Sequence, residues 1–220
     1  MLGLFVSDVA AQAPDGYEIN VIAVSSTTTD ELAGLKIPIW GLGVAGAVEW
    51  QVARPFSAIP QIELSVMPKL EYAPRGVRQS FSDLDATGSH FVDAGTRLHY
   101  LSIPVFAKAR YSFDESPLAL YVMGGPRFDL MIESESGTFD FADGRLSSNL
   151  DERYERATLG LSGGIGLQIA VSERIAFTLE VRRHRDVTTP VDEGGTSPVD
   201  RTAGTMRNLA TDYSFGVKWK

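Results

Sequence analysis

The segment that most constrains the fold is IWGLGVAGAVEW, residues 39–50, because its side chains alternate without a break. Trp40, Leu42 and Trp50 share one face of an extended chain, whereas Glu49 shares the other face with glycines and alanines. Such period-two alternation predicts a β-strand. A soluble protein would bury the tryptophans and expose the glycines and alanines, which suit a water-facing strand poorly. A membrane barrel would instead turn the tryptophans toward lipid. The pattern of the remaining strands distinguishes a soluble protein from a membrane barrel.

Eight segments have strand character, and helical periodicity is hard to find anywhere in the chain. The predicted strands are roughly 17–24, 38–53, 59–73, 98–112, 117–132, 154–171, 175–185 and 208–219. The long connections are 25–37, 74–97, 133–153 and 186–207, and the short ones, which alternate with them, read RPFSA, SFDES and SER. This plan predicts an all-β fold, an eight-stranded antiparallel up-and-down transmembrane β-barrel, as one outer-membrane domain over residues 17–220. The long loops would be external and both termini periplasmic.

The small face recurs on later strands and favours the membrane arrangement. In TLGLSGGIGLQIAV, residues 158–171, leucine and isoleucine alternate with glycine, serine and glutamine. Glycine inside a narrow barrel leaves room for long side chains from other strands. A strand tilted by ~40° rises about 25 Å between Trp40 and Trp50, which is the height of a lipid-facing band. The aromatic residues expected at the two membrane interfaces are Trp40, Trp50, Tyr72, Tyr111, Phe113 and Trp219.

Charged residues occupy the inward phase in equal numbers of each sign. The acids are Glu49, Glu63, Glu71, Asp129, Glu180 and Asp212, and the bases are Lys69, Lys108, Arg110, Arg127, Arg182 and Lys218. Buried charges persist only when they are paired, and these two sets can pair completely. We therefore expect a cross-lumen charge network that fills the barrel and leaves no conducting pore.

Composition excludes several other classes. No run approaches ~18 consecutive apolar residues, so a helical membrane span is excluded. The chain has no cysteine, which rules out disulfides and thiolate chemistry. The net charge of -8 argues against nucleic acid as a partner. The N-terminus reaches Ala11-Gln12-Ala13, a small-x-small pattern typical of signal-peptidase sites, so residues 1–13 are interpreted as the remnant of a secretory signal peptide. A disordered terminus is the alternative.

The segment YLSIPVFAKARYSF, followed by a short turn and LYVMGGPRFDLMI, resembles the core of the PorT-like outer membrane β-barrel family. The matching positions are Tyr100 to Pro104, Lys108, Arg110 and the pair Gly125-Pro126. LSGGIGLQI, TLEVRRHRDVT and YSFGVKWK resemble later strands of that family, so the resemblance covers about residues 39–220. The first strand is degenerate, and the chain ends in Trp219-Lys220 rather than in a terminal phenylalanine. The resemblance implies a small eight-stranded outer-membrane barrel, a family in which some members serve protein secretion.

Three groups of residues could support catalysis or ligand binding. Barrel hydrolases that trim lipids place a Ser–His pair with a carboxylate on the lipid-facing rim. Here His184 neighbours Asp186 near the outer end of its strand, but no serine stands at a fixed offset in that strand. Arg183 and Arg185 lie on the lipid-facing phase, where they would either bind lipopolysaccharide phosphates or reach the interface without specificity. The predicted loop 133–153 contains an acidic cluster, which would either bind Ca²⁺ through its carboxylate oxygens or remain solvated. Its members are Glu133, Glu135, Asp140, Asp143, Asp151 and Glu152.

We therefore expect no catalytic residue, metal or cofactor, and a non-enzymatic outer-membrane protein with a structural or partner-binding role through its external loops. A component of a secretion or assembly machine would fit. Its expected partners are membrane lipid, lipopolysaccharide and other envelope proteins. The alternatives are a lipid-modifying hydrolase of the outer membrane and a soluble up-and-down barrel that binds an apolar ligand.

Overall fold

The computed structural model describes residues 13–28, 35–53, 61–85, 88–140, 145–147, 156–188 and 208–220. The strands are β1 (Gly16–Thr28), β2 (Leu35–Ala53), β3 (Ile62–Asp85), β4 (Gly88–Ser112), β5 (Leu118–Asp140), β6 (Arg145–Ser147), β7 (Ala157–Ala170), β8 (Ile175–Asp186) and β9 (Asn208–Trp219). Over the described ranges, no helix is long and apolar enough to cross a membrane. The proposed signal-peptide remnant lies almost entirely outside the described residues.

The strands form a single sheet that closes on itself. Their order is β4-β3-β2-β1-β9-β8-β7-β5-β6, and β4 also pairs with β5. All neighbouring pairs are antiparallel. Eight long strands therefore make a closed barrel, and the short β6 is attached to the far end of β5. The predicted eight-stranded antiparallel barrel is confirmed.

The strands wind around the barrel with a fixed stagger. A row of directly paired residues that leaves β2 at Trp50 returns to β2 at Trp40, ten residues along the strand. The row consists of Trp50, Val66, Ala107, Gly124, Gly163, Arg183, Thr211, Ser25 and Trp40. With a strand tilt of about 40°, one circuit of this row climbs about 25 Å along the barrel axis.

Side chains alternate between the lumen and the outer face. Leu42 is 73% exposed on the outer face, whereas Tyr121 is 2% exposed in the lumen. A Cβ atom added to the inward-facing Gly166 would lie 2.2 Å from the Tyr121 ring, so glycine is needed there to admit that side chain. The tryptophan face of β2 thus points outward and its small face inward. This arrangement is opposite to that of a soluble barrel with an apolar interior.

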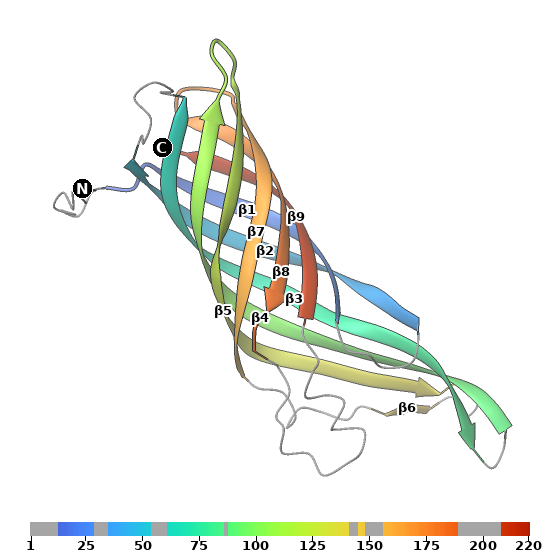
Figure 1. Cartoon of the computed structure of the whole chain (residues 1–220). Coiled ribbons are helices and arrows are strands. Elements are labelled where there is room, and N and C mark those ends of the chain that lie inside the picture. Colours follow the sequence, from blue (N-terminus) through green and yellow to red (C-terminus); the bar gives the residue numbers. More distant parts are fainter. Residues whose placement is uncertain are drawn as a thin grey trace, which may run out of the picture.

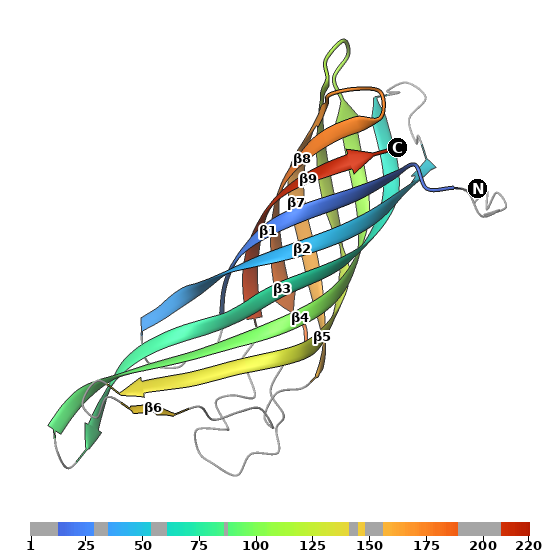
Figure 2. The same cartoon turned by 180° about the vertical axis from the view of Figure 1, so that it is seen from behind.

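Several strands are longer than predicted, and the prediction of a loop over 74–97 is wrong. The β3–β4 ladder continues from the Pro74–His99 pair to the Asp85–Gly88 pair, and β5 follows β4 as far as Asp140. Above a lipid-facing band neither face of the sheet meets hydrocarbon, so the apolar alternation stops while backbone pairing continues. Figures 1 and 2 show these segments as a sheet that protrudes from one end of the barrel.

The start of β1, the C-terminus and the tight turns lie at the opposite end (Figure 1). The turn after β4 is closed by Phe113 N, which donates to Leu118 O at 3.2 Å, and Glu115 adopts a left-handed φ of 56° in it. The turn after β7 is closed by Val171 N, which donates to Ile175 O at 2.9 Å. These are the predicted SFDES and SER turns, whereas the whole of RPFSA lies outside the described residues.

Candidate functional site

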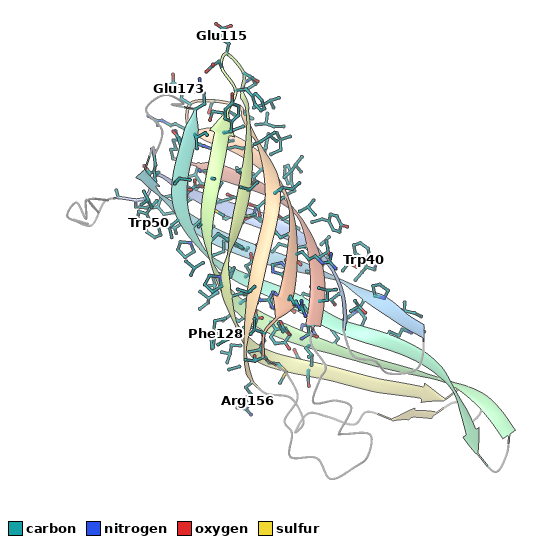
Figure 3. All side chains as sticks on the ribbon, in the orientation of Figure 1. Trp40, Trp50, Glu115, Phe128, Arg156 and Glu173 are labelled. Carbon is teal, nitrogen blue, oxygen red and sulfur yellow. The ribbon has the colours of Figure 1, made fainter. Side chains whose placement is uncertain are left out.

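The candidate site is the lumen, which is lined by charged side chains. Of the twelve charged residues predicted to face it, ten are buried, and Glu63 and Arg110 are partly exposed. Figure 3 shows the side chains on the ribbon, with Glu115 and Glu173 at the tight-turn end and Arg156 toward the opposite end. The charged groups are arranged in layers between these two ends.

The layer nearest the tight turns is centred on Glu49. Its Oε2 accepts hydrogen bonds from Lys108 Nζ at 3.0 Å and from Lys218 Nζ at 2.7 Å, and its Oε1 accepts one from Ser65 Oγ at 2.8 Å. Lys108 Nζ also lies 4.0 Å from the centroid of the Tyr121 ring. One carboxylate therefore holds two ammonium groups from opposite sides of the lumen.

The next layer is centred on Glu180 of β8. Lys69 Nζ donates to its Oε2 at 2.8 Å, Tyr121 Oη donates to its Oε1 at 3.0 Å, and Ser214 Oγ donates to Oε2 at 3.1 Å. Glu18 of β1 lies 4.0 Å from the same Lys69 Nζ. Each charged group in this layer thus has a partner from a strand across the barrel.

Arg182 occupies the middle of the lumen and is fully buried. Its guanidinium pairs with Glu71 and lies 3.3 Å from Asp212 Oδ2 and 3.6 Å from Glu180 Oε2. The guanidinium also lies 5.8 Å from the centroid of the Phe106 ring. Three carboxylates from three strands therefore converge on a single arginine.

The layer nearest the protruding sheet contains two arginines. Arg75 Nη1 lies 3.1 Å from Asp129 Oδ1, and Arg127 Nε donates to Asp129 Oδ2 at 2.7 Å. Arg127 Nη2 donates to Asp186 Oδ1 at 2.5 Å, and Asn208 Nδ2 donates to Asp186 Oδ2 at 2.8 Å. This layer covers the lumen between Arg182 and the protruding sheet.

The layers contain residues that sequence reasoning missed. Glu18 was missed because its strand reads as degenerate, and Arg75 and Asp186 were assigned to loops. The alternation from Glu71 through Ala73 to Arg75, and from Arg182 through His184 to Asp186, carries the inward phase past the predicted strand ends. Conversely, Arg110 pairs with Glu63 and Gln168 at the tight-turn end, apart from the central layers.

A serine, a histidine and an aspartate form a hydrogen-bonded chain in the lumen. Ser162 Oγ lies 2.7 Å from His184 Nδ1, and His184 Nε2 lies 2.6 Å from Asp212 Oδ2. Serine hydrolases use the same order of groups. All three side chains are buried beneath the Arg127–Asp186 layer. The alternation of β8 turns His184 and Asp186 into the lumen, so neither lies on a lipid-facing rim, where a lipid hydrolase would place them.

The predicted interface aromatics are on the outer face. Trp40 stacks on Tyr213 with ring centroids 6.2 Å apart, and Trp219 stacks on Tyr17 at 6.1 Å. Tyr111 and Phe113 make an edge-to-face contact at 5.1 Å. Trp50 also lies on the outward phase of β2, and Tyr72 stacks on His99 at 5.9 Å, with Tyr72 Oη 2.6 Å from His99 Nδ1.

Arg183 and Arg185 are exposed on the outer face of β8. Of the predicted acidic cluster, only the side chain of Glu133 is described, and it is exposed. The other five acids, Glu135, Asp140, Asp143, Asp151 and Glu152, lie outside the described side chains. Among the residues that the structure describes, no group of three or more histidines and acids is arranged to hold a metal ion.

Comparison with known proteins gives one family and several solved barrels. A family model described as outer membrane protein beta-barrel domain matches residues 15–185. No curated protein matches the chain. A major outer membrane protein from Thermus thermophilus is 13% identical, with 92% of this chain and 98% of that chain covered, at a TM-score of 0.49. OprG from Pseudomonas aeruginosa is 11% identical, with 93% and 94% covered, at 0.45. The outer membrane enzyme PagL is 12% identical, with 91% and 98% covered, at 0.40. Such distant likenesses carry no argument about activity.

Proposed function

Because the chain belongs to the family of outer membrane protein beta-barrel domains, we propose that it is a non-conducting, non-enzymatic barrel that presents its protruding sheet to a protein partner. The observation that carries this proposal is the filled lumen. Carboxylates and cations from non-adjacent strands meet in it in successive layers, from Glu49 at one end to Arg127 at the other. An eight-stranded barrel has an interior just wide enough for side chains to fill.

A role outside catalysis is supported by the Ser162–His184–Asp212 chain. The histidine is 1% exposed and is held between two hydrogen-bond partners. A lipid substrate on the outer face would be separated from the serine by the wall of the sheet. A substrate from the open end would have to displace the Arg127–Asp186 pair. These groups are therefore assigned to the packing of the lumen.

The first test is electrical. Purified protein in planar bilayers should show no stable channel, because Glu71, Asp212 and Phe106 converge on Arg182 in the middle of the lumen. The measurement is single-channel recording at low protein concentration, with a known porin as the positive control. A stable, large conductance from the wild-type barrel would replace this proposal with a pore function.

The partner-binding role is supported by the length of β3, β4 and β5 beyond the barrel. Five strands, with β2 and β6 at the edges, continue as an open sheet after β1, β7, β8 and β9 have ended (Figure 2). Unpaired strand edges offer backbone groups to an incoming strand. We place this end outside the cell and the tight turns and termini in the periplasm, as in other outer-membrane barrels.

The absence of native cysteine permits a direct test of this placement. A cysteine is introduced either at Arg97, exposed on the protruding part of β4, or at Glu115, exposed in a tight turn. Intact cells are treated with a membrane-impermeant maleimide–succinimidyl cross-linker. Arg97→Cys should give a cross-linked adduct heavier than the barrel, and Glu115→Cys should give none. An adduct from Glu115→Cys alone would invert the orientation, and labelling of Arg97→Cys without any adduct would contradict the partner-binding role.

Within the family we propose a PorT-like barrel in the envelope of a Gram-negative-type cell, exported with a cleaved signal peptide, that serves a secretion or assembly machine. Support comes from the sequence resemblance, whose Tyr100 to Pro104 motif lies on β4 and whose Gly125-Pro126 pair lies on β5. The tyrosine contacts the guanidinium of Arg75, 5.4 Å from its ring centroid, so the motif contributes to the lumen layers.

A further inference from the structure

Two arginines interrupt the apolar outer face of the barrel. Arg183 and Arg185 point outward from β8, between Val181 and Val187. Neither makes an ion pair with any other described residue. Within the described lengths of β7, β8, β9 and β1, no acidic side chain faces outward. Among the described residues, these two positive charges therefore have no counter-charge on this wall.

The stagger of the strands gives the height of these arginines. In the paired row that climbs from Trp50 to Trp40, Arg183 is the fifth of eight steps. It therefore lies about 15 Å above Trp50 in a band of about 25 Å. Arg185 lies two residues nearer the protruding sheet, at about 20 Å. The next two steps of the row, Thr211 and Ser25, are also polar.

The wall at β5, two strand steps from β8, stays apolar to a greater height. On β5, Phe128, Leu130 and Ile132 are all exposed. Ile132 lies eight residues above Gly124 along β5, toward the protruding sheet. Arg183 is reached from Gly124 by two steps of the paired row, through Gly163. The apolar wall therefore reaches about 14 Å higher on β5 than the level at which β8 becomes polar. A bilayer of uniform thickness cannot match both walls.

Ser25, Arg183, Arg185 and Thr211 form what we call the polar notch. Next to it lies a hollow of about 590 Å³ in the outer wall. Its lining consists of the two arginines, Leu161, Gly163 and Leu209, together with Ser162 and His184, whose side chains are buried on the lumen side of the wall. Gly163 leaves this part of the wall without a side chain. The stacked Trp40 and Tyr213 rings border the notch on the β2 side.

We propose that the polar notch binds the phosphate of an outer-leaflet lipid, with lipid A as the occupant. Guanidinium groups bind phosphate through paired, charge-assisted hydrogen bonds, and the hydroxyls of Thr211 and Ser25 add neutral donors. The apolar lining of the hollow accepts the first carbons of an acyl chain beneath the phosphate. The choice of the outer leaflet rests on the proposed orientation, which places the protruding sheet outside the cell.

The binding test uses native mass spectrometry of the purified barrel, released from detergent micelles with bis-phosphorylated lipid A added. The double variant Arg183→Gln/Arg185→Gln should bind lipid A at least tenfold more weakly than wild type. Arg174→Gln is the matched control, because this arginine is exposed in the tight turn at the other end. Excess inorganic phosphate should compete only weakly with the lipid. Equal lipid A binding by wild type and the double variant would overturn the proposal. Micelles expose both ends of the barrel, so an error in orientation would not affect this result.

A second measurement tests the height argument without lipid A. Thr211 on β9 and Phe128 on β5 lie at nearly the same height, three strand steps apart around the barrel. Thr211 is reached from Gly124 by three steps of the paired row, and Phe128 lies four residues above Gly124. Each is replaced by cysteine and labelled with a polarity-sensitive fluorophore in phosphatidylglycerol vesicles. The label at Thr211→Cys should report a headgroup environment and the label at Phe128→Cys a hydrocarbon environment. Hydrocarbon-like emission from both positions would mean that the headgroups do not reach the notch, and would overturn the proposal.

Discussion

Replacing Arg182 by methionine should destabilise the folded barrel by about 3–5 kcal/mol, because it leaves buried carboxylates without their cation. Glu71 and Asp212 both pair with this guanidinium, and both are fully buried. Methionine fills most of the volume, so the loss is mainly electrostatic. The measurement is the urea dependence of folding into lipid vesicles, followed by the shift in gel mobility between folded and unfolded barrel.

Two controls separate the charge from the substitution itself. Arg174→Met removes an arginine from an exposed turn and should change the free energy of unfolding by less than about 0.5 kcal/mol. Adding Glu71→Gln to Arg182→Met removes one of the stranded charges, and the double variant should be more stable than Arg182→Met alone. If the second substitution worsens the loss, the arginine contributes through packing rather than through its charge.

The surroundings of Arg182 show how much of this site the sequence could predict. The inward orientation of its acids was predictable, and their pairing was not. Glu71, Glu180 and Asp212 stand on strands with clear apolar alternation, so their inward phase follows from the pattern alone. Which acid meets which base does not follow, because a pairing depends on the stagger between strands. One residue of slip would turn every side chain to the other face.

The layer nearest the protruding sheet shows where prediction from the hydrophobic pattern fails. Arg75 and Asp186 stand at the ends of the alternating segments, where solvent replaces lipid outside the barrel and apolar residues are no longer selected. The interior still needs paired charges there, and the inward phase continues for one or two more residues. The same loss of pattern hid the extension of β3 and β4 as far as the Asp85–Gly88 pair. The barrel was therefore predictable from its lipid-facing part, and the protruding sheet was not.

Replacing Val44 by arginine tests the lipid-facing assignment on which the fold prediction was built. Val44 is 51% exposed on the outer face of β2, between the Trp40 and Trp50 levels. An arginine there should cost about 2–4 kcal/mol of folding free energy in vesicles, since its charge would lie in the hydrocarbon on β2, a wall outside the polar notch. Val44→Leu exposes a similar apolar surface to lipid and should leave stability within about 0.5 kcal/mol of wild type.

The sharpest control lies on the same strand and the same face. Val52 is 66% exposed, two residues beyond Trp50 toward the tight-turn end. Val52→Arg introduces the same charge at the interface, where it should cost about 0–1 kcal/mol. A penalty that depends on depth can arise only if a membrane surrounds this wall, because water would treat the two positions alike. Equal and small losses at Val44 and Val52, measured by urea titration in the same vesicles, would mean that the tryptophan face of β2 does not face lipid.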